Sequence, residues 1–307
     1  MFENKRYRTL SYELKKIFGK KVIKLSIDGG FTCPNRDGTI GEKGCLFCSE
    51  EGSGEFAGDS RNTISRQMDQ QKKLLKKKWD TELVIPYFQA FTSTYDSISK
   101  LKIKYDEALR YSGAVGLAVA TRPDCLESDK VELLSKYNKD YLVWVELGLQ
   151  TIHKKSADLI RRGYDLKVFE DSLKKLNYEG IKAVVHVIIG LPGESKSDII
   201  KTIKYLSSQN IWGIKFHLLH ILKDTDLEKY YYKNKFKLLE KDEYIDIICD
   251  AIEYLRDDIV VHRVTGDGKK SDLIAPRWSL DKLRVLSGID MELKKRNSYQ
   301  GIKYLPQ

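Results

Sequence analysis

Strand-like and helix-period segments alternate along most of this 307-residue chain, and that alternation limits its possible folds more than any other feature. Continuous apolar runs, such as "LVIPYF" at 83–88 and "VVHVII" at 184–189, are typical of strands buried on both faces of a parallel sheet. Six strand–helix units fall between residues 22 and 222, too few for a complete eight-stranded barrel. We therefore expect an α/β fold built on an open, partial (β/α)6 barrel.

Segments outside these units predict the domain organisation. "YRTLSYELKKIF" at 7–18 has a helical period, and the chain after 222 reads as helix (240–255), strand (258–268) and helix (280–295). No low-complexity linker separates these parts. We expect an N-terminal helix within 1–21, the barrel at 22–222, and a C-terminal α/β extension packed on the barrel at 223–307.

Charge and hydropathy restrict the cellular setting. No apolar run is long enough to cross a bilayer, and the first ten residues, "MFENKRYRTL", carry charges where a signal peptide needs an apolar stretch, so we expect a cytoplasmic protein. The net charge of +10 is concentrated in lysine-rich segments such as 72–79 and 293–297. Such a charge favours a polyanionic partner, although solvated helix faces explain it equally well.

Three of the five cysteines, Cys33, Cys45 and Cys48, lie in one glycine-rich loop directly after the first predicted strand. A structural zinc site needs four ligands, and the next candidate, Cys125, is distant. A four-iron cluster held by three thiolates keeps one iron open for another ligand. A zinc site completed by a distant residue or water is the alternative. Cys249 has the pattern of a helix core.

Polar residues gather at the carboxyl ends of the predicted strands, which is the face that carries the chemistry in α/β barrels. The cysteine loop opens on the same face. The other members of this set are Gln89, Thr92, Thr94, Thr121, Arg122, Glu146, Gln150, His217 and His220.

Nine stretches between residues 22 and 278 carry a resemblance to a known family: "LSIDGGFTCPNRDG", "GCLFCSEEGSGEF", "YFQAFTSTY", "ATRPDCL", "VELGLQTIH", "RRGYD", "HVIIGLPGE", "KFHLLHILKDT" and "HRVTGDG". In this order they resemble the radical S-adenosylmethionine (SAM) superfamily. The spacing C-x11-C-x2-C departs from the superfamily's usual C-x3-C-x2-C. It is similar to that of the group containing the Elongator catalytic subunit and the YhcC/YtqA-like proteins.

This resemblance implies two cofactors, a [4Fe–4S] cluster and SAM, and assigns residues to them. Cys33, Cys45 and Cys48 would hold the cluster, and its open iron would bind the amine and carboxylate of SAM. A reduced cluster would then cleave SAM to methionine and a 5′-deoxyadenosyl radical. Further SAM contacts are implied for Gln89, Thr92 and Thr94 at the amine, Glu146 and Gln150 at the ribose, Arg162 at the carboxylate, His186 and Ile188 beside the adenine, and Thr121 and Arg122 at a strand end. An ordinary strand-end hydrogen bond is the alternative for each polar residue.

The resemblance also implies a substrate, a wobble uridine in tRNA whose carboxymethylaminomethyl group is trimmed to aminomethyl. A one-electron donor such as flavodoxin or ferredoxin would be needed, and neither DNA nor a membrane is expected as a partner. The open side of the barrel would be lined by Lys215, His217, His220, His262, Arg263, Asp267 and Trp278, with His217, His220, His262 and Asp267 as candidate catalytic groups and Arg263 or Trp278 stacking on the base.

Three alternatives stay open at this point. The His/Asp group could be a structural hydrogen-bond network, the substrate could be a small metabolite or a peptide, and the chain could be a zinc-stabilised RNA-binding module. If the lysines of 72–77 and 293–297 meet near the barrel mouth, they could hold the anticodon arm of tRNA while the wobble base is flipped inside.

Overall fold

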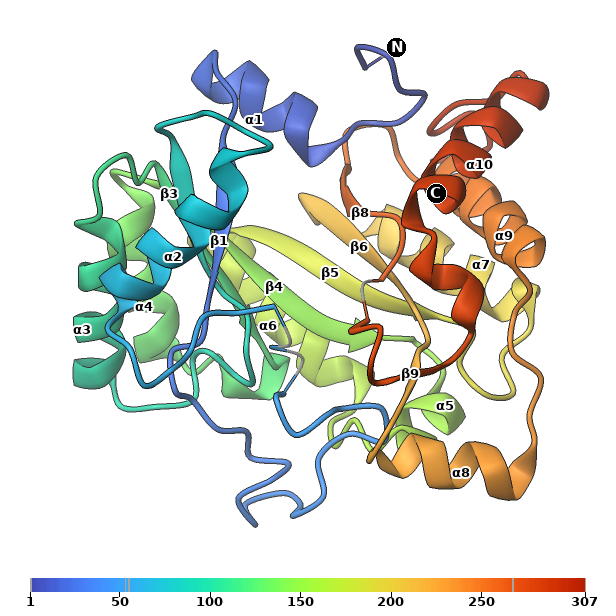
Figure 1. Cartoon of the computed structure of the whole chain (residues 1–307), viewed down its shortest axis with the longest axis horizontal. Helices are drawn as coiled ribbons and strands as arrows, with labels where there is room; N and C mark the ends of the chain where they lie inside the picture. The colour runs from blue at the N-terminus through green and yellow to red at the C-terminus, as the bar shows by residue number, and fades with distance from the viewer. Residues whose placement is uncertain (1, 53, 55, 267, 307) are drawn as a thin grey trace.

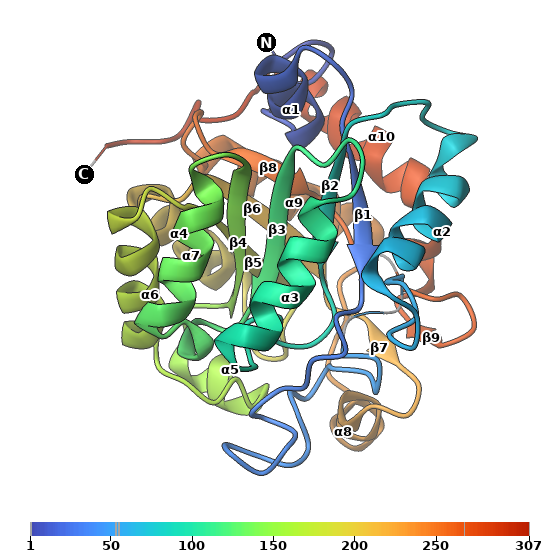
Figure 2. The same cartoon turned by 90° about the vertical axis from the view of Figure 1, so that its left-hand side faces the viewer.

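The computed structural model describes residues 2–52, 54, 56–266 and 268–306. Its centre is a seven-stranded, all-parallel sheet in the order β1-β2-β3-β4-β5-β6-β8, which curls into an open barrel wall (Figures 1 and 2). The expected α/β partial barrel is thereby confirmed, with a seventh strand contributed by the C-terminal extension. The strands are β1 (Ile23–Ile27), β2 (Val84–Phe88), β3 (Gly116–Thr121), β4 (Leu142–Gln150), β5 (Lys182–Ile189), β6 (Gly213–Leu218) and β8 (Val260–Arg263).

Helices cover the outer face of this sheet because their apolar stripes pack on strands that are buried throughout. The helix α7 begins with a capping box, in which the side chains of Ser195 and Asp198 satisfy each other's backbone N–H groups. The covering helices are α2 (Ile64–Lys76), α3 (Ile98–Leu109), α4 (Ser128–Asn138), α6 (Leu166–Tyr178) and α7 (Lys196–Ser208), whereas α5 (Lys154–Leu159) lies at the carboxyl end of the barrel beside the cysteine loop (Figure 2). A short 3-10 helix, η1 (Pro123–Cys125), follows β3.

The amino-terminal end of the barrel is closed by α1 (Leu10–Phe18), which lies across it in Figure 2. Leu10 and Leu14 from this helix join one apolar cluster with Ile85, Trp144 and Val184 from the strands. This cluster fills the amino end of the barrel, so polar groups inside the barrel face its opposite, carboxyl end.

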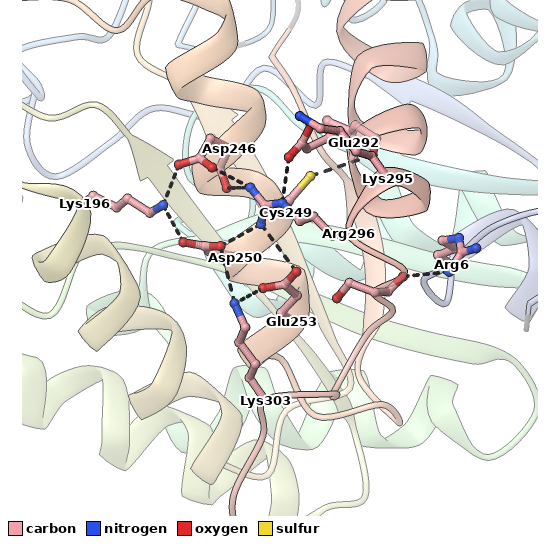
Figure 3. A network of polar contacts seen from close by, with 12 residues as sticks. Arg6, Lys196, Asp246, Cys249, Asp250, Glu253, Glu292, Lys295, Arg296 and Lys303 are labelled. Carbon is pink, nitrogen blue, oxygen red and sulfur yellow. Dashed lines mark hydrogen bonds and ion pairs between the residues drawn. The ribbon is translucent and has the colours of Figure 1, made fainter.

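The C-terminal extension is attached to the barrel by strand pairing, helix packing and ion pairs. Its strand β8 pairs with β6, and its helices α9 (Lys241–Tyr254) and α10 (Lys282–Lys295) pack side by side. Figure 3 shows Arg296 beyond α10 bound to Asp246, Asp250 and Glu253 on α9, while Lys196 from α7 binds Asp246 and Asp250. Its remaining elements are β7 (Ile221–Leu222), α8 (Asp226–Asn234), β9 (Leu273–Ala275) and η2 (Arg277–Leu280).

Two further expectations concern this part of the chain. Cys249 is fully buried within α9, as predicted for a helix-core residue. The boundary between barrel and extension at residue 222 stays a prediction. No helix among the described residues is long and apolar enough to span a membrane.

The two lysine-rich segments lie at the amino end of the barrel, so the expectation that they meet near its mouth is wrong. The chain leaving α2 reaches Leu83, whose carbonyl accepts a hydrogen bond from the first β1 residue, Ile23. Beyond α10, Gln300 donates to the carbonyl of Ile259, which immediately precedes β8. The lysines of α2 lie at this end because a helix in a β/α unit runs antiparallel to the strands and returns the chain to their amino ends.

Candidate active site

A cavity of about 340 Å³ opens at the carboxyl ends of the barrel strands, and we name it the chamber. Its walls come from the cysteine loop, from all seven strands of the sheet and from the segments that follow them. The structure brings most of the predicted site residues together here: Cys33, Cys45, Cys48, Gln89, Thr92, Thr121, Arg122, Glu146, Gln150, Arg162, His186, Ile188, Lys215, His217, His220 and Arg263.

The cysteine loop is shaped by tight turns within the segment itself. Two backbone N–H groups, those of Arg36 and Asp37, donate to the carbonyl of Cys33, and Cys48 donates to Cys45 over 3.0 Å. Gly44 has a φ of +70°, and a Cβ at this position would lie 2.8 Å from Nε of Arg36. Glycine is therefore required here both for the backbone conformation and for the close approach of the arginine.

The three thiols fit a cluster better than a single metal ion. Among the described residues, no group of three His, Cys, Asp or Glu side chains is arranged to hold one ion. Cys33, Cys45 and Cys48 nevertheless line the same chamber, and Asn35 holds Cys45 through an Nδ2–Sγ contact of 3.5 Å. Burial, followed by the neighbouring thiol of Cys48, raises the pKa of Cys45 to about 12. Three thiols on one cavity match a four-iron cluster that leaves one iron for another ligand.

One predicted SAM contact does not reach the chamber. Thr94 is absent from the lining, and its hydroxyl is bound to the hydroxyl of Thr121 and the carbonyl of Cys125, each over 2.6 Å. Its observed contacts are those of a buried structural residue, whereas Gln89 and Thr92 do face the chamber.

Two arginines stand together on the wall of the chamber. The guanidinium of Arg162 donates to the carbonyls of Leu149 and Thr151 over 3.1 and 2.7 Å, while Arg122 is paired with Asp124 over 2.7 Å. Both guanidinium groups lie against the ring of Tyr164, at 4.8 and 5.0 Å from its centroid. Arg162 is therefore held in one orientation, and its predicted role at the SAM carboxylate stays a prediction.

A buried cluster of charges lies deeper in the barrel, centred on Glu146. This residue sits in the middle of β4 rather than at its end, and it is only 1% exposed. One carboxylate oxygen accepts hydrogen bonds from Tyr87, His186 and Lys215, over 2.8, 2.7 and 2.8 Å. The other accepts from Trp144 over 3.0 Å and from Lys24 over 3.4 Å. The ribose contact expected of Glu146 stays a prediction.

The pKa values of this cluster reflect burial and mutual charge. Burial raises the pKa of Glu146, but Lys215, Lys24 and His186 outweigh that effect and hold it well below its usual value. Burial lowers the pKa of Lys215 to about 7, against the opposing charge of Glu146. Burial and then Lys215 lower the pKa of His186 to about 4, so this imidazole is neutral at pH 7.

The four candidate catalytic groups are distributed over different places. His217 and His220 line the chamber, and the ring of His217 lies 4.9 Å from that of His186. His262 lines a second, adjoining cavity instead. Asp267 lies outside the described residues.

Trp278 does not line the open side of the barrel, so the prediction that it could stack on a substrate base is wrong. Its ring packs against Tyr244 at 5.6 Å, and its indole N–H donates to the carbonyl of Leu239. An apolar residue at the start of a helix can pack in either direction, and here the neighbouring α9 supplies the contact.

Lys24 and Tyr87 belong to the site but were not predicted from the sequence. Tyr87 stands two residues before Gln89, so the two-residue period of a strand puts both side chains on the interior face. Lys24 is the one charged residue of β1, where it alternates with buried apolar residues, and that position was the available signal. Arg36, inside the cysteine loop, was also missed although it lines the chamber.

Comparison with known proteins identifies this arrangement. The family model described as "Radical SAM superfamily" matches residues 33–206, and that of the "Radical_SAM C-terminal domain" matches 211–295. The chain is 44% identical to the uncharacterized protein YtqA of Bacillus subtilis over 297 residues, covering 97% of this chain and 92% of YtqA.

Two further matches have lower sequence identity, and one of them is to a tRNA-modifying enzyme. The chain is 24% identical to the tRNA uridine(34) acetyltransferase of Methanocaldococcus infernus over 156 residues, which is 50% of this chain and 29% of that protein. A solved structure of Methanocaldococcus infernus Elp3, lacking residues 1–46, superposes with a TM-score of 0.68 at 17% identity, over 91% of this chain and 64% of that one. This superposition shows a shared fold. From the two family models and the long YtqA match, the chain belongs to the radical SAM superfamily, whose members use a [4Fe–4S] cluster and SAM.

Proposed function

We propose that this radical SAM enzyme acts on a wobble uridine of tRNA and converts a carboxymethylaminomethyl side chain to aminomethyl. The observation that carries the proposal is the chamber itself, which joins the three cysteines of the cluster loop to a charged interior centred on Glu146 and Lys215. The similarity to a tRNA uridine(34) acetyltransferase supports tRNA as the substrate. Family membership removes the zinc-stabilised RNA-binding module from consideration.

Cys33, Cys45 and Cys48 would hold the cluster, and the bound cluster with SAM supplies a carbon radical able to take hydrogen from an unactivated carbon. The chain's own contribution is to orient the reactants and to exclude water. Phe47 lies between the last two cysteines in the sequence and lines the chamber. Arg36 and Phe91 also line the chamber, and the guanidinium of Arg36 lies 5.6 Å from the ring centre of Phe91. These groups lie beside the cysteines, which are themselves half-buried.

The overall change on the substrate is an oxidation followed by hydrolysis. Removal of one hydrogen atom and one further electron from the methylene beside the carboxylate leaves an iminium ion. Water then releases the free amine and glyoxylate, with SAM consumed as the oxidant to give methionine and 5′-deoxyadenosine. A one-electron donor of the flavodoxin or ferredoxin type, in the cytoplasm, would reduce the cluster at the start, and the further electron lost by the substrate would return to the cluster, so that one SAM balances each conversion.

A basic surface beside the mouth of the chamber supports binding of an RNA. The helix α8 lies against the cysteine loop: the N–H of Leu227 donates to the carbonyl of Leu46 over 2.8 Å, and Asp226 pairs with Arg161. Figure 2 shows α8 and the cysteine loop at the same end of the barrel, opposite α1. We name as the α8 surface the exposed residues Lys229, Tyr232 and Lys233 of α8 together with Lys235 and Lys237 directly after it.

Lysines interspersed with an exposed aromatic ring suit a phosphate backbone with accessible bases. The α8 surface replaces the lysines of 72–77 and 293–297 as the proposed contact, because those lie at the amino end of the barrel.

Mass spectrometry of tRNA nucleosides from a strain lacking the gene tests the proposal. Loss of aminomethyl-type nucleosides, with accumulation of 5-carboxymethylaminomethyl-uridine, is the expected result. An unchanged set of wobble-uridine nucleosides would contradict the tRNA substrate and favour a metabolite or peptide.

A further inference from the structure

A second cavity, of about 430 Å³, lies at the open side of the barrel between the edge strands β1 and β8. We name it the side cavity. The start of α1 and the first part of α10 complete its walls, through residues such as Ser11 and Leu286. Its volume is in the range of small-molecule binding sites.

Among the described residues, the lining of the side cavity carries basic groups and no carboxylate. The basic residues are Lys24, Lys215, Arg263 and Lys282. Lys24 and Lys215 share a single carboxylate, that of Glu146, which lines the chamber and not the side cavity. Two ammonium groups around one carboxylate leave a net positive charge beside the cavity.

The side cavity also contains a buried imidazole that has no partner. Neither ring nitrogen of His262 has a hydrogen-bond partner among the described residues, although both are shielded from solvent. The ring is fixed by edge contacts with Trp144 and Trp212, whose centroids lie 5.7 and 5.1 Å away. A buried polar group without a partner costs free energy, so a ligand that accepts its hydrogen bond would be stabilised.

The side cavity adjoins the chamber through shared walls. The residues that line both are Ser26, Tyr87, Gln89, Lys215 and Arg263. The hydroxyl of Tyr87 lies 2.8 Å from both Lys215 and Glu146, so it connects the charged cluster to this boundary. The side cavity and the chamber therefore share part of one wall.

We propose that the side cavity binds an oxyanion of the substrate, with Lys24 and Lys215 as the charged partners and His262 as a hydrogen-bond donor. A cation would add to an uncompensated positive charge, and an apolar ligand would leave the His262 nitrogens unpaired. The identity of the group rests on the proposed function: it is the carboxylate of the carboxymethyl arm or a phosphate of the same nucleotide. The cavity's preference for an oxyanion does not depend on that function.

The preference is tested first with simple anions. Cluster-loaded, SAM-bound protein is titrated with malonate and with sulfate by calorimetry. Lys24→Met removes a charge but leaves the Lys215–Glu146 pair, and His262→Phe keeps the aromatic packing but removes the donor. Affinity should fall roughly tenfold or more in Lys24→Met, the size of one charge-assisted hydrogen bond, and by less in His262→Phe.

The matched control is Lys76→Met, which removes the same charge from the exposed face of α2 and should bind both anions as the parent does. Iron content and thermal unfolding confirm that each variant is folded and loaded. A parent protein that binds neither anion, or equal affinities in Lys24→Met and Lys76→Met, would overturn the assignment.

A competition experiment then identifies the source of the oxyanion. Displacement of malonate by 5-carboxymethylaminomethyl-uridine but not by uridine 5′-monophosphate assigns the site to the carboxylate of the base. The reverse pattern assigns it to a nucleotide phosphate. If malonate binds as expected and neither compound displaces it, the side cavity stands as an oxyanion site and the proposed tRNA function fails.

Discussion

The ammonium group of Lys215 on β6 lies 2.8 Å from a carboxylate oxygen of Glu146 on β4, inside the barrel and shielded from solvent. Buried ion pairs seldom add net stability, because both charges lose their hydration. The cluster also includes Lys24, Tyr87 and His186. We therefore attribute it to ligand binding rather than to stabilisation of the fold.

Removing one partner of this pair should destabilise the fold strongly. In Glu146→Gln, Lys215 loses its buried counter-charge, and the free energy of unfolding should fall by about 3–5 kcal/mol. The control is Glu82→Gln, which breaks the surface pair with Lys72 and should have no measurable effect. Denaturant titration of both variants checks this, and equal stabilities would mean that the Glu146 carboxylate is not paired as described.

Binding of an oxyanion in the side cavity should weaken as the pH rises through neutrality. Lys215 has its pKa lowered to about 7 by burial, so it is charged below that pH and neutral above it. Two of its neighbours keep their charge state in this window: the pKa of Glu146 is well below its usual value, and that of His186 is about 4. The groups facing Lys215 are Lys24, Tyr87, Glu146, His186, His217 and Arg263.

Calorimetric titration with sulfate, which stays a dianion throughout, measures this effect. Affinity should be highest near pH 6 and should fall between about pH 6 and about pH 8. The Lys24→Met variant should keep the same pH step at a lower affinity. Affinity that does not change over this range would show that Lys215 does not contact the anion.

Charge reversal on α8 should weaken tRNA binding, whereas the same reversal on α2 should not. Four exposed lysines are changed to glutamate in each variant: Lys229, Lys233, Lys235 and Lys237 on the α8 surface, and Lys73, Lys76, Lys77 and Lys78 in the control. The net charge of the two variants is identical, so a difference in their tRNA affinity depends on where the mutated lysines lie. The log–log salt slope should flatten by roughly 0.7–0.9 per lost phosphate contact in the α8 variant alone.

Equal losses in the two variants would indicate a general charge effect and would remove the α8 surface from the proposal. Substrate-free SAM cleavage by the α2 variant should match that of the parent.

The cysteine assignments predict a simple pattern of iron content. Anaerobically reconstituted protein should be brown with about four irons per chain. Cys33→Ala, Cys45→Ala and Cys48→Ala should each abolish this, while Cys249→Ala, buried in α9, should retain the cluster. Stoichiometric zinc without iron in the parent would contradict the assignment.

The sheet could be predicted from the sequence because strands buried on both faces, such as β2, appear as continuous apolar runs. The polar residues of the chamber could be predicted too, because they follow these apolar runs and the carboxyl ends of parallel strands lie at one end of the barrel. The pairing of β8 with β6 could not be predicted, because nothing in the local sequence of a short strand specifies its neighbour.

The interior charges were harder to foresee. Lys215 was placed near the site, but Lys24 has the same character and was missed, since a lysine in a strand is usually assigned to the exposed face. The lysine pattern of α2 predicts a basic helix face, and Lys73 and Lys76 of this helix are exposed in the structure. Its distance from the mouth depends on the direction of the helix, which the charge pattern does not encode.

The most direct test of the proposed reaction measures both of its products in one assay. The reduced, cluster-loaded protein is incubated anaerobically with SAM and with tRNA from the deletion strain, and 5′-deoxyadenosine and modified nucleosides are measured together. We expect aminomethyl-uridine to appear as carboxymethylaminomethyl-uridine disappears, with one 5′-deoxyadenosine formed for each conversion. Formation of 5′-deoxyadenosine without any change in the wobble nucleosides would contradict the proposed reaction.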